Sequence, residues 1–233
     1  MDKFLKRKVN NDDDDNNEDV NTKKKSKSIV STSKIPLIVL PGASGRLSQS
    51  MQSEVLNKFQ NSNLTVIKKD SINWNKYAAG NPSNITEILN LIPSDDEFYL
   101  LGNSFGNRVI CEFVSNSSNC RNCRGIILCG YPLYGEKNNE DRVNQLKKIP
   151  KHMKLLMISG NLDDFLNQNY LNEKGEKLMR KQFTDLSLSN DHSKLIIVEN
   201  GLHDLPKTKG KNAKETTKNA ALLIVNEIKN FCT

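Results

Sequence analysis

The sequence lacks long apolar runs and is poor in aromatic residues and in histidine. Aromatic residues make up 6% of the 233 residues, with a single tryptophan, and only three histidines occur. No stretch reaches the roughly 18 consecutive apolar residues that a membrane-spanning helix needs. The first ten residues, MDKFLKRKVN, lack the apolar core of a secretory signal. We therefore predict no membrane partner, and a cytoplasmic or nuclear location.

Cysteines are too few and too irregularly spaced for a disulfide framework or a zinc finger. There are five, an odd number, which in a chain without a secretory signal predicts reduced thiols. Cys120 and Cys123 have metal-like spacing, but no second pair or histidine follows at zinc-finger distance. A loop between a helix and a strand explains the pair better. The sequence predicts neither a metal nor another cofactor.

The formal net charge of +7 raises the question of nucleic-acid binding. Nine of the 34 basic and seven of the 27 acidic residues fall in the first 34 positions, so residues 35–233 hold 25 and 20, a net of +5. Neither zinc-finger spacing nor an aromatic-studded RNA-binding segment accompanies this charge. We predict no nucleic-acid partner.

Residues 1–34 have the composition of a disordered tail. Between positions 10 and 28 the residues are mainly Asp, Asn, Lys and Ser, which cannot bury enough apolar surface to offset the entropy of ordering the backbone. The basic clusters at 6–8 and 23–25 fit a two-part nuclear import signal, and they also fit a tract that merely keeps the tail solvated. The sequence leaves both interpretations open. The folded domain is predicted to span 35–233.

Short apolar runs alternate with amphipathic stretches throughout this domain. The apolar runs are hydrophobic on both pleat faces, as buried parallel strands are. The alternation predicts an α/β fold with a mostly parallel six-stranded sheet and helices on both faces. Strands are predicted at 35–40, 64–68, 98–101, 125–129, 154–159 and 194–198, and helices at 50–59, 84–91, 106–115, 140–147, 173–183 and 212–231. Functional residues of such sheets follow the carboxyl ends of strands.

Ser104 follows the third predicted strand in FYLLGNSFGNRVICEF and has Gly102 and Gly106 on its two sides. A G-x-S-x-G pattern between a strand and a helix is typical of the nucleophile elbow, a turn too tight for flanking side chains. The alternative is a serine that caps the helix, which needs the hydroxyl but neither glycine. The two glycines favour a nucleophile.

A serine nucleophile needs a base beside it. His152 and His192 each precede a predicted strand, so both belong to the wrong end of the sheet. His203 follows the last strand and is the predicted base; the alternative is a surface-loop histidine.

A carboxylate should hold the imidazole of this base. Asp163 and Asp164 directly follow the fifth predicted strand, and Asp163 is nearer the strand end. We predict Asp163 as the acid, although either aspartate could instead cap the next helix. The chain order Ser104, Asp163, His203 is the nucleophile–acid–base order of α/β-hydrolase sheets.

Backbone donors for an oxyanion are expected on two loops. One is the amide of Phe105, and the other is the amide of Ala43, with Ser44 as second choice, in the glycine-containing turn LPGASGRL. A phosphate-binding interpretation of that turn lacks both G-x-G-x-x-G and G-x-x-x-x-G-K-S/T.

Five short motifs together resemble a known family. The motifs LPGASG, GNSFGNR, CGYPLYG, SGNLDDF and NGLHDL resemble the α/β-hydrolase-like family of testis-expressed protein 30, which includes the hydrolase-like subunit of the NSL histone-acetyltransferase complex and is akin to dienelactone hydrolases. The resemblance spans roughly 35–233 and implies Ser104 as nucleophile, Asp163 as acid and His203 as base. Pro41 and Ser44 depart from the family's His-Gly-Ala-Gly-Gly loop. Some relatives act in chromatin complexes.

These observations predict a small α/β-hydrolase with little or no cap that cleaves a small ester or thioester through an acyl-enzyme. Tyr131 and Pro132 are expected to line the acyl or leaving-group side. Five lysines after His203 would form a basic rim favouring anionic substrates, or merely a solvated helix face: Lys207, Lys209, Lys211, Lys214 and Lys218. The competing hypothesis is a catalytically silent interaction module with a protein partner in a nuclear complex. A complete apparent triad argues against it.

Overall fold

The computed structural model describes residues 34–76, 78–93, 96–116, 118–134, 142–166, 172–185 and 193–233. The predicted tail therefore lies outside the described residues except for Lys34, as do His192 and the first two positions of the helix predicted at 140–147. The disorder of the tail and the domain boundary stay predictions.

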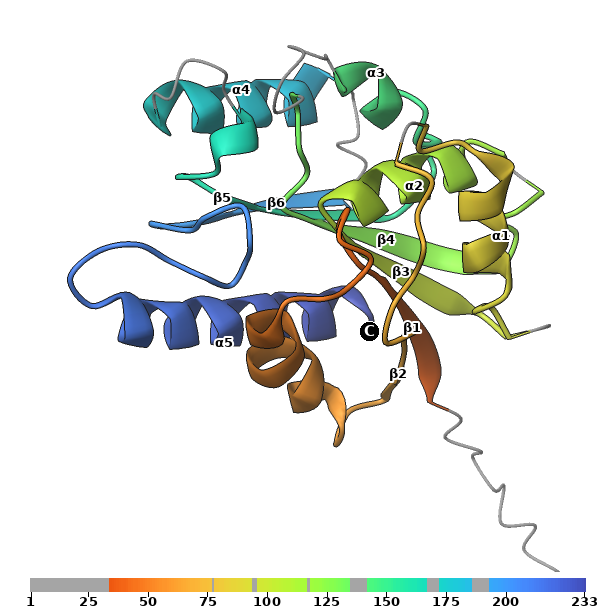
Figure 1. The fold of residues 1–233 in the computed structure, drawn as a ribbon, viewed down its shortest axis with the longest axis horizontal. Helices are drawn as coiled ribbons and strands as arrows, with labels where there is room; N and C mark the ends of the chain where they lie inside the picture. The colour runs from red at the N-terminus through yellow and green to blue at the C-terminus, as the bar shows by residue number, and fades with distance from the viewer. Residues whose placement is uncertain are drawn as a thin grey trace, which may run out of the picture. The chain divides into compact units, whose positions relative to one another are not determined.

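Six strands form one sheet in the order β2-β1-β3-β4-β5-β6, and every neighbouring pair is parallel (Figure 1). Each predicted strand is confirmed to within two residues at either end. The strands are β1 (Ile35–Leu40), β2 (Leu64–Ile67), β3 (Phe98–Asn103), β4 (Cys123–Cys129), β5 (Leu155–Gly160) and β6 (Ser193–Val198).

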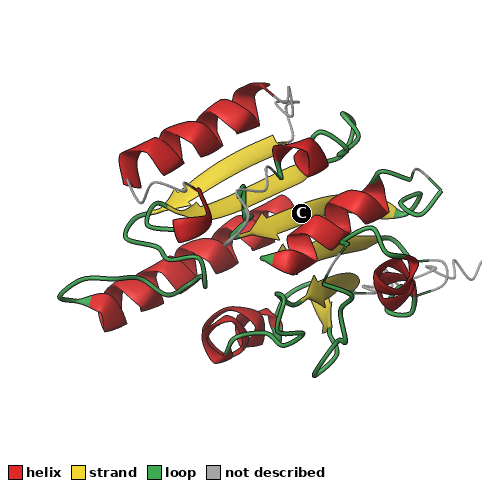
Figure 2. Ribbon diagram, turned by 45° about the horizontal axis from the view of Figure 1, so that its top comes forward, coloured by secondary structure: helices red, strands yellow, loops and turns green. Residues whose placement is uncertain are grey.

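Helices cover both faces of the sheet (Figures 1 and 2). They are α1 (Pro82–Leu89), α2 (Phe105–Val114), α3 (Val143–Leu146), α4 (Asn172–Asp185) and α5 (Ala213–Phe231). None of the described helices combines the length and the apolar content that crossing a bilayer requires. The described residues between β4 and β5 form only the four-residue helix α3, in line with the prediction of little or no cap.

Three helices differ from their predicted form. Helix α3 covers only Val143–Leu146 of the predicted 140–147, of which 140 and 141 lie outside the described residues. The segment predicted as a regular helix at 50–59 is a π-helical turn, η1 (Met51–Val55), followed by a 3₁₀ turn, η2 (Leu56–Phe59). This change of turn width lets both the 51/55 and the 56/59 side chains be buried. Helix α1 begins two residues before the predicted start because Asn81 caps it and Pro82 occupies its first position.

Successive strand residues point to opposite faces of the sheet, and their side chains belong to two hydrophobic clusters, one on each face. Ile38 and Leu40 belong to the cluster that α1, α2, α3 and α4 cover, whereas Leu37 and Val39 belong to the cluster that η1, η2 and α5 cover. The inner strands β1, β3, β4 and β5 are buried almost throughout, while the edge strands β2 and β6 are partly exposed. This construction leaves the loops at the carboxyl ends of the strands to form a site.

Candidate active site

Ser104 is the single residue between β3 and α2, and its backbone conformation is unusual. Its φ is 50° and its ψ is −110°, although it is not glycine. Such a conformation costs about 1–3 kcal/mol and clusters at functional sites. Ser104 occupies the capping position of α2, yet its side chain makes no capping hydrogen bond. The hydroxyl is therefore not used to stabilise the helix.

The two glycines beside Ser104 are required by close backbone approach. A Cβ atom at Gly102 would lie 2.8 Å from the backbone nitrogen of Asn107, and one at Gly106 would lie 2.7 Å from the carbonyl oxygens of Leu40 and Pro41. Real Cβ atoms do not approach that closely. The physical reason predicted for the G-x-S-x-G pattern is thus confirmed.

The turn is also tied to the neighbouring strand. The backbone amide of Ser104 donates to the carbonyl oxygen of Cys129 at 3.3 Å, and Asn107 Nδ2 donates to the same oxygen at 2.8 Å. Asn107 was not among the predicted site residues, since nothing in the local pattern marks its side chain as an anchor.

The structure brings Ser104 and His203 together. The distance from His203 Nε2 to Ser104 Oγ is 2.8 Å, and His203 Nδ1 lies 3.0 and 2.9 Å from the two carboxylate oxygens of Asp163. A carboxylate only accepts hydrogen bonds, so Nδ1 carries the proton and Nε2 accepts from the Ser104 hydroxyl. The imidazole is 20% exposed, which leaves it reachable from solvent.

Asp163, rather than its neighbour, contacts the histidine. Its side chain is 0% exposed, and besides His203 it accepts a hydrogen bond from the backbone amide of Phe165 at 2.8 Å. A buried carboxylate needs such donors to offset its desolvation. Asp164 is exposed and begins the 3₁₀ turn η3 (Asp164–Leu166).

The loops that carry Asp163 and His203 are joined by backbone hydrogen bonds. The amide of Asn161 donates to Val198 at 3.1 Å, and that of Leu162 donates to Gly201 at 2.9 Å. The ring of Phe165 packs against the imidazole of His203, with 4.2 Å between centroids and the ring planes tilted by 42°. The sequence carries no signal for this contact, because it depends on how two distant loops meet.

Trp74 anchors the loop in which oxyanion donors were predicted. Its Nε1 donates to the carbonyl oxygens of Pro41 at 3.2 Å and Gly42 at 3.1 Å. In a trans peptide the carbonyl and the following N–H point in opposite directions, so the amide of Ala43 points away from Trp74. A Cβ atom at Gly42 would lie 3.4 Å from Ser104 Cβ, which places this loop against the serine.

The three predicted donor amides are unused within the described part of the chain. There, neither Ala43, Ser44 nor Phe105 donates a backbone hydrogen bond. Pro41 has no N–H, and this departure from the family pattern leaves those three amides intact.

The expected substrate-lining residues are placed differently. Tyr131 is 0% exposed, and its hydroxyl donates to the carbonyl oxygen of Arg142 at 3.1 Å. Burial raises the pKa of Tyr131 well above its ordinary value. Pro132 is buried as well. Neither side chain presents a surface to a substrate, because both are buried; the prediction that they line the substrate is not borne out by the structure.

The remaining nucleophile and metal candidates do not compete with Ser104. His152 is exposed and precedes β5, at the other end of the sheet from Ser104. All five cysteines are described, and none forms a disulfide. Burial raises the pKa of the Cys129 thiol, next to the serine turn, to about 12, so it stays protonated and unreactive at neutral pH. Across the described ranges, no three His, Cys, Asp or Glu side chains are grouped as metal ligands.

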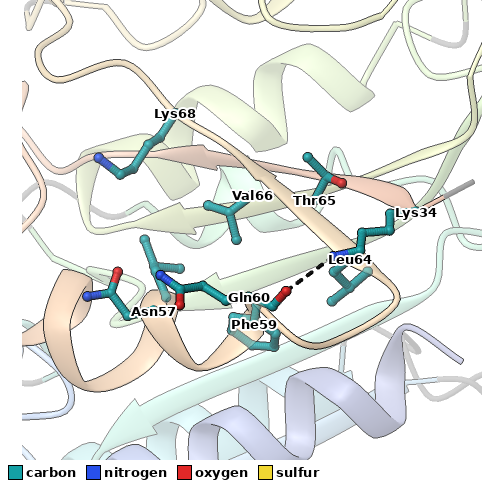
Figure 3. A pocket seen from close by; sticks show the side chains of 9 residues that line it. Lys34, Asn57, Phe59, Gln60, Leu64, Thr65, Val66 and Lys68 are labelled. Carbon is teal, nitrogen blue, oxygen red and sulfur yellow. Dashed lines mark hydrogen bonds between the residues drawn. The ribbon is translucent and has the colours of Figure 1, made fainter.

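A separate hollow of about 300 Å³ lies along edge strand β2 and contains none of the predicted site residues (Figure 3). Its lining includes Leu56, Phe59 and Val66. Lys34, also in the lining, donates from Nζ to the carbonyl oxygen of Gln60 at 3.1 Å (Figure 3). None of the residues that line it is a histidine, cysteine, aspartate or glutamate, so its Thr65 hydroxyl has no paired base there.

Comparison with known protein families places this geometry in context. Residues 73–232, more than half of the chain, match the model of the alpha/beta hydrolase domain. The chain belongs to the alpha/beta hydrolase family. The match contains Ser104, Asp163 and His203, and it begins after the loop that contains Ala43. A comparison with curated protein sequences found no match.

Solved structures share the fold of this alpha/beta hydrolase at low sequence identity. The monoacylglycerol lipase of Paleococcus ferrophilus is 10% identical with a TM-score of 0.57, over 84% of this chain and 94% of the lipase. Mouse alpha/beta hydrolase domain-containing protein 10 is 11% identical with a TM-score of 0.56, over 84% and 89%. The thioesterase domain from the curacin biosynthetic pathway is 12% identical with a TM-score of 0.55, over 83% and 92%. These similarities confirm the predicted fold class.

Proposed function

We propose that the chain is a serine hydrolase that cleaves a small ester or thioester, with Ser104 as nucleophile, His203 as general base and acid, and Asp163 as the group that orients the imidazole. One observation carries the proposal: a strained serine whose hydroxyl caps nothing lies 2.8 Å from Nε2 of His203, whose other ring nitrogen contacts the carboxylate of Asp163. A serine hydroxyl becomes a nucleophile only with such a base beside it.

In the proposed reaction, Nε2 of His203 removes the hydroxyl proton while Ser104 Oγ forms a bond to the substrate carbonyl carbon. The carboxylate of Asp163 stabilises the resulting imidazolium without taking its proton. The tetrahedral intermediate collapses, the bond to the leaving group breaks, and the leaving oxygen or sulfur takes the proton from Nε2. His203 then takes a proton from water, whose oxygen forms a bond to the acyl carbon; the bond from that carbon to Ser104 Oγ breaks, Oγ takes the proton back from Nε2, and the acid is released.

The amides of Phe105 and Ala43 are the proposed oxyanion donors, with Ser44 as the second choice for the latter. The lack of other hydrogen bonds from these amides in the described chain supports this role. The Phe105 amide also lies at the positive end of α2. Loss of one such donor typically slows the reaction by about 10²–10³-fold.

We also propose a narrower family, a cellular location and a protein partner. The five motifs quoted above support kinship with the family of testis-expressed protein 30. The proposed location is the cytoplasm or the nucleus, and a protein partner in a complex is proposed in addition to the hydrolase activity. No observation favours the silent interaction module. The cellular distribution of a chain that lacks residues 1–34 tests whether the basic clusters act as a nuclear import signal. A distribution equal to that of the full chain would refute the import signal.

Trapping of the acyl-enzyme tests the proposed mechanism. Rapid mixing with p-nitrophenyl butyrate should release a burst of one nitrophenolate per active chain. Acid quenching and peptide mass spectrometry should then find the butyryl group on the peptide that contains Ser104. His203→Ala should show neither. Butyrylation of another residue, or folded wild-type protein without turnover, would contradict the proposal.

A further inference from the structure

A lysine-lined pocket lies between two segments that continue from loops of the candidate active site. It has a volume of about 560 Å³ and lies between the segment 49–54 and the start of α5, which pack side by side below the sheet (Figure 1). Its walls include Ser50, Ser53, Lys207, Lys214 and Lys218. The opposing charge on its lining is the carboxylate of Glu54. Binding sites for small molecules commonly have volumes of about 300–1,000 Å³.

Lys207 connects this pocket to His203. Its ammonium group pairs with Asp204, the residue after His203, at 2.6 Å, and its carbonyl oxygen accepts from the amide of Leu202, the residue before His203, at 2.9 Å. The opposite wall, 49–54, continues from the loop that contains Ala43. Both walls are therefore extensions of loops that build the site.

Two of the lysines have no ion pair within the described part of the chain. Lys214 and Lys218 are four residues apart on α5, so they project from the same face of the helix. Neither forms a salt bridge with a described residue. Lysine ammonium groups bind phosphate as mobile point charges. The hydroxyls of Ser50 and Ser53 supply neutral donors on the facing wall.

We propose that this pocket binds a phosphate group on the leaving-group side of the substrate, so that the preferred substrate is an acyl ester or thioester of a phosphorylated alcohol or thiol. The leaving group is assigned to this side because Lys207, which lines the pocket, is bonded to the residues before and after His203, the group that must protonate the leaving group. This inference rests on the proposed function and narrows its substrate class.

A matched pair of thioesters tests the inference. Butyryl-coenzyme A carries phosphates on its leaving thiol, whereas S-butyryl-N-acetylcysteamine has the same reacting carbonyl and no charge. Wild type should prefer the former in kcat/KM, and the preference should shrink as salt is raised. Equal kcat/KM values for the two thioesters at low salt would overturn the inference while leaving the proposed function intact.

Charge variants locate the binding site. Lys214→Gln/Lys218→Gln should raise KM for butyryl-coenzyme A by about three- to tenfold and leave the neutral thioester unaffected. Glu54→Gln should lower that KM, since it removes the opposing charge. The control Lys209→Gln/Lys211→Gln removes the same charge from exposed lysines that do not line the pocket. If the control raised KM as much as the pocket variant does, the effect would come from the overall positive charge of the protein. That result would refute phosphate binding in the pocket.

Binding without catalysis separates the two proposals. Calorimetry with free coenzyme A and Ser104→Ala protein should give saturable binding that Lys214→Gln/Lys218→Gln weakens. If wild type hydrolyses no thioester but this binding is found, the proposal of a phosphate-binding pocket is supported and the proposed function is refuted. If coenzyme A does not bind, the proposal of a phosphate-binding pocket is refuted.

Discussion

Helices α1 and α2 both begin at a small polar residue, yet the two residues are used in opposite ways. Asn81 has an ordinary φ of −59°, and its side chain accepts a hydrogen bond from the amide of Ser83. Ser104 has a φ of 50°, makes no capping bond, and lies 2.8 Å from His203. Helix α1 thus has a cap that stabilises it, whereas α2 begins at a strained residue whose hydroxyl faces another side chain.

A serine that caps a helix can thus be distinguished from a serine positioned to react. A capping side chain stabilises the helix by accepting a hydrogen bond from a first-turn amide, and it requires no particular residues on either side. Ser104 instead needs Gly102 and Gly106, two hydrogen bonds to Cys129 and a paired histidine, none of which helix formation requires. Three pairs of substitutions test this distinction.

Among substitutions that keep the nucleophile, the largest loss of activity is expected from the acid that holds the imidazole. Asp163→Asn should lower kcat/KM for p-nitrophenyl butyrate by about 10⁴-fold, because the amide favours the wrong histidine tautomer. Asp164→Asn is the matched control, since its side chain is exposed, and it should change the rate by less than about twofold. Similar losses in the two variants would mean that the Asp163–His203 contact does not serve the reaction.

The glycine after the serine should matter more for stability than the glycine before the capped helix. A Cβ at Gly106 would meet two backbone oxygens at 2.7 Å, so Gly106→Ala should lower the free energy of unfolding by about 3 kcal/mol. A Cβ at Gly80 would meet only a side-chain atom, a carboxylate oxygen of Glu112 at 3.2 Å, which a shift of a few tenths of an ångström relieves, so Gly80→Ala should cost less than about 1 kcal/mol. Urea unfolding measures the loss in free energy of unfolding for both variants. Equal losses would contradict the inference that the turn at Gly106 has no room for a side chain.

The smallest effect is expected from the cap itself. Asn81→Ala should lower the free energy of unfolding by about 1 kcal/mol and leave hydrolysis unchanged, because it removes the bond to Ser83. Ser104→Ala should abolish hydrolysis and cost less stability than Asn81→Ala, because its hydroxyl caps nothing. The reverse ranking of stabilities would make Ser104 a cap.

Local patterns were enough to predict the strands and the placement of the three site residues. Buried parallel strands are continuous apolar runs, and the pairing of glycines around Ser104 is visible within five residues. His203 could be chosen because only one of three histidines follows a strand. The Asn81–Pro82 start of α1 was equally local, but apolar periodicity alone placed the helix too late.

Contacts between distant segments could not be predicted in this way. Trp74 reaches Gly42 across 32 residues, and Phe165 meets His203 only because the loops after β5 and β6 converge. Tyr131 was predicted to contact the substrate because it follows a strand. Its burial depends on how α2 and α3 pack around it, which the local sequence does not show. Likewise, the lysine run after His203 did not indicate which members share a pocket with 49–54.

Covalent labelling by a fluorophosphonate probe tests the central claim most directly, because the probe reacts only with a serine activated by an adjacent base. Purified wild type should be labelled at Ser104, and both Ser104→Ala and His203→Ala should lose the label while remaining folded. The pKa of the Cys129 thiol, which burial raises to about 12, makes labelling at that neighbour negligible at neutral pH. Folded wild-type protein that stays unlabelled, or labelling that survives His203→Ala, would contradict the assignment of Ser104 as an activated nucleophile.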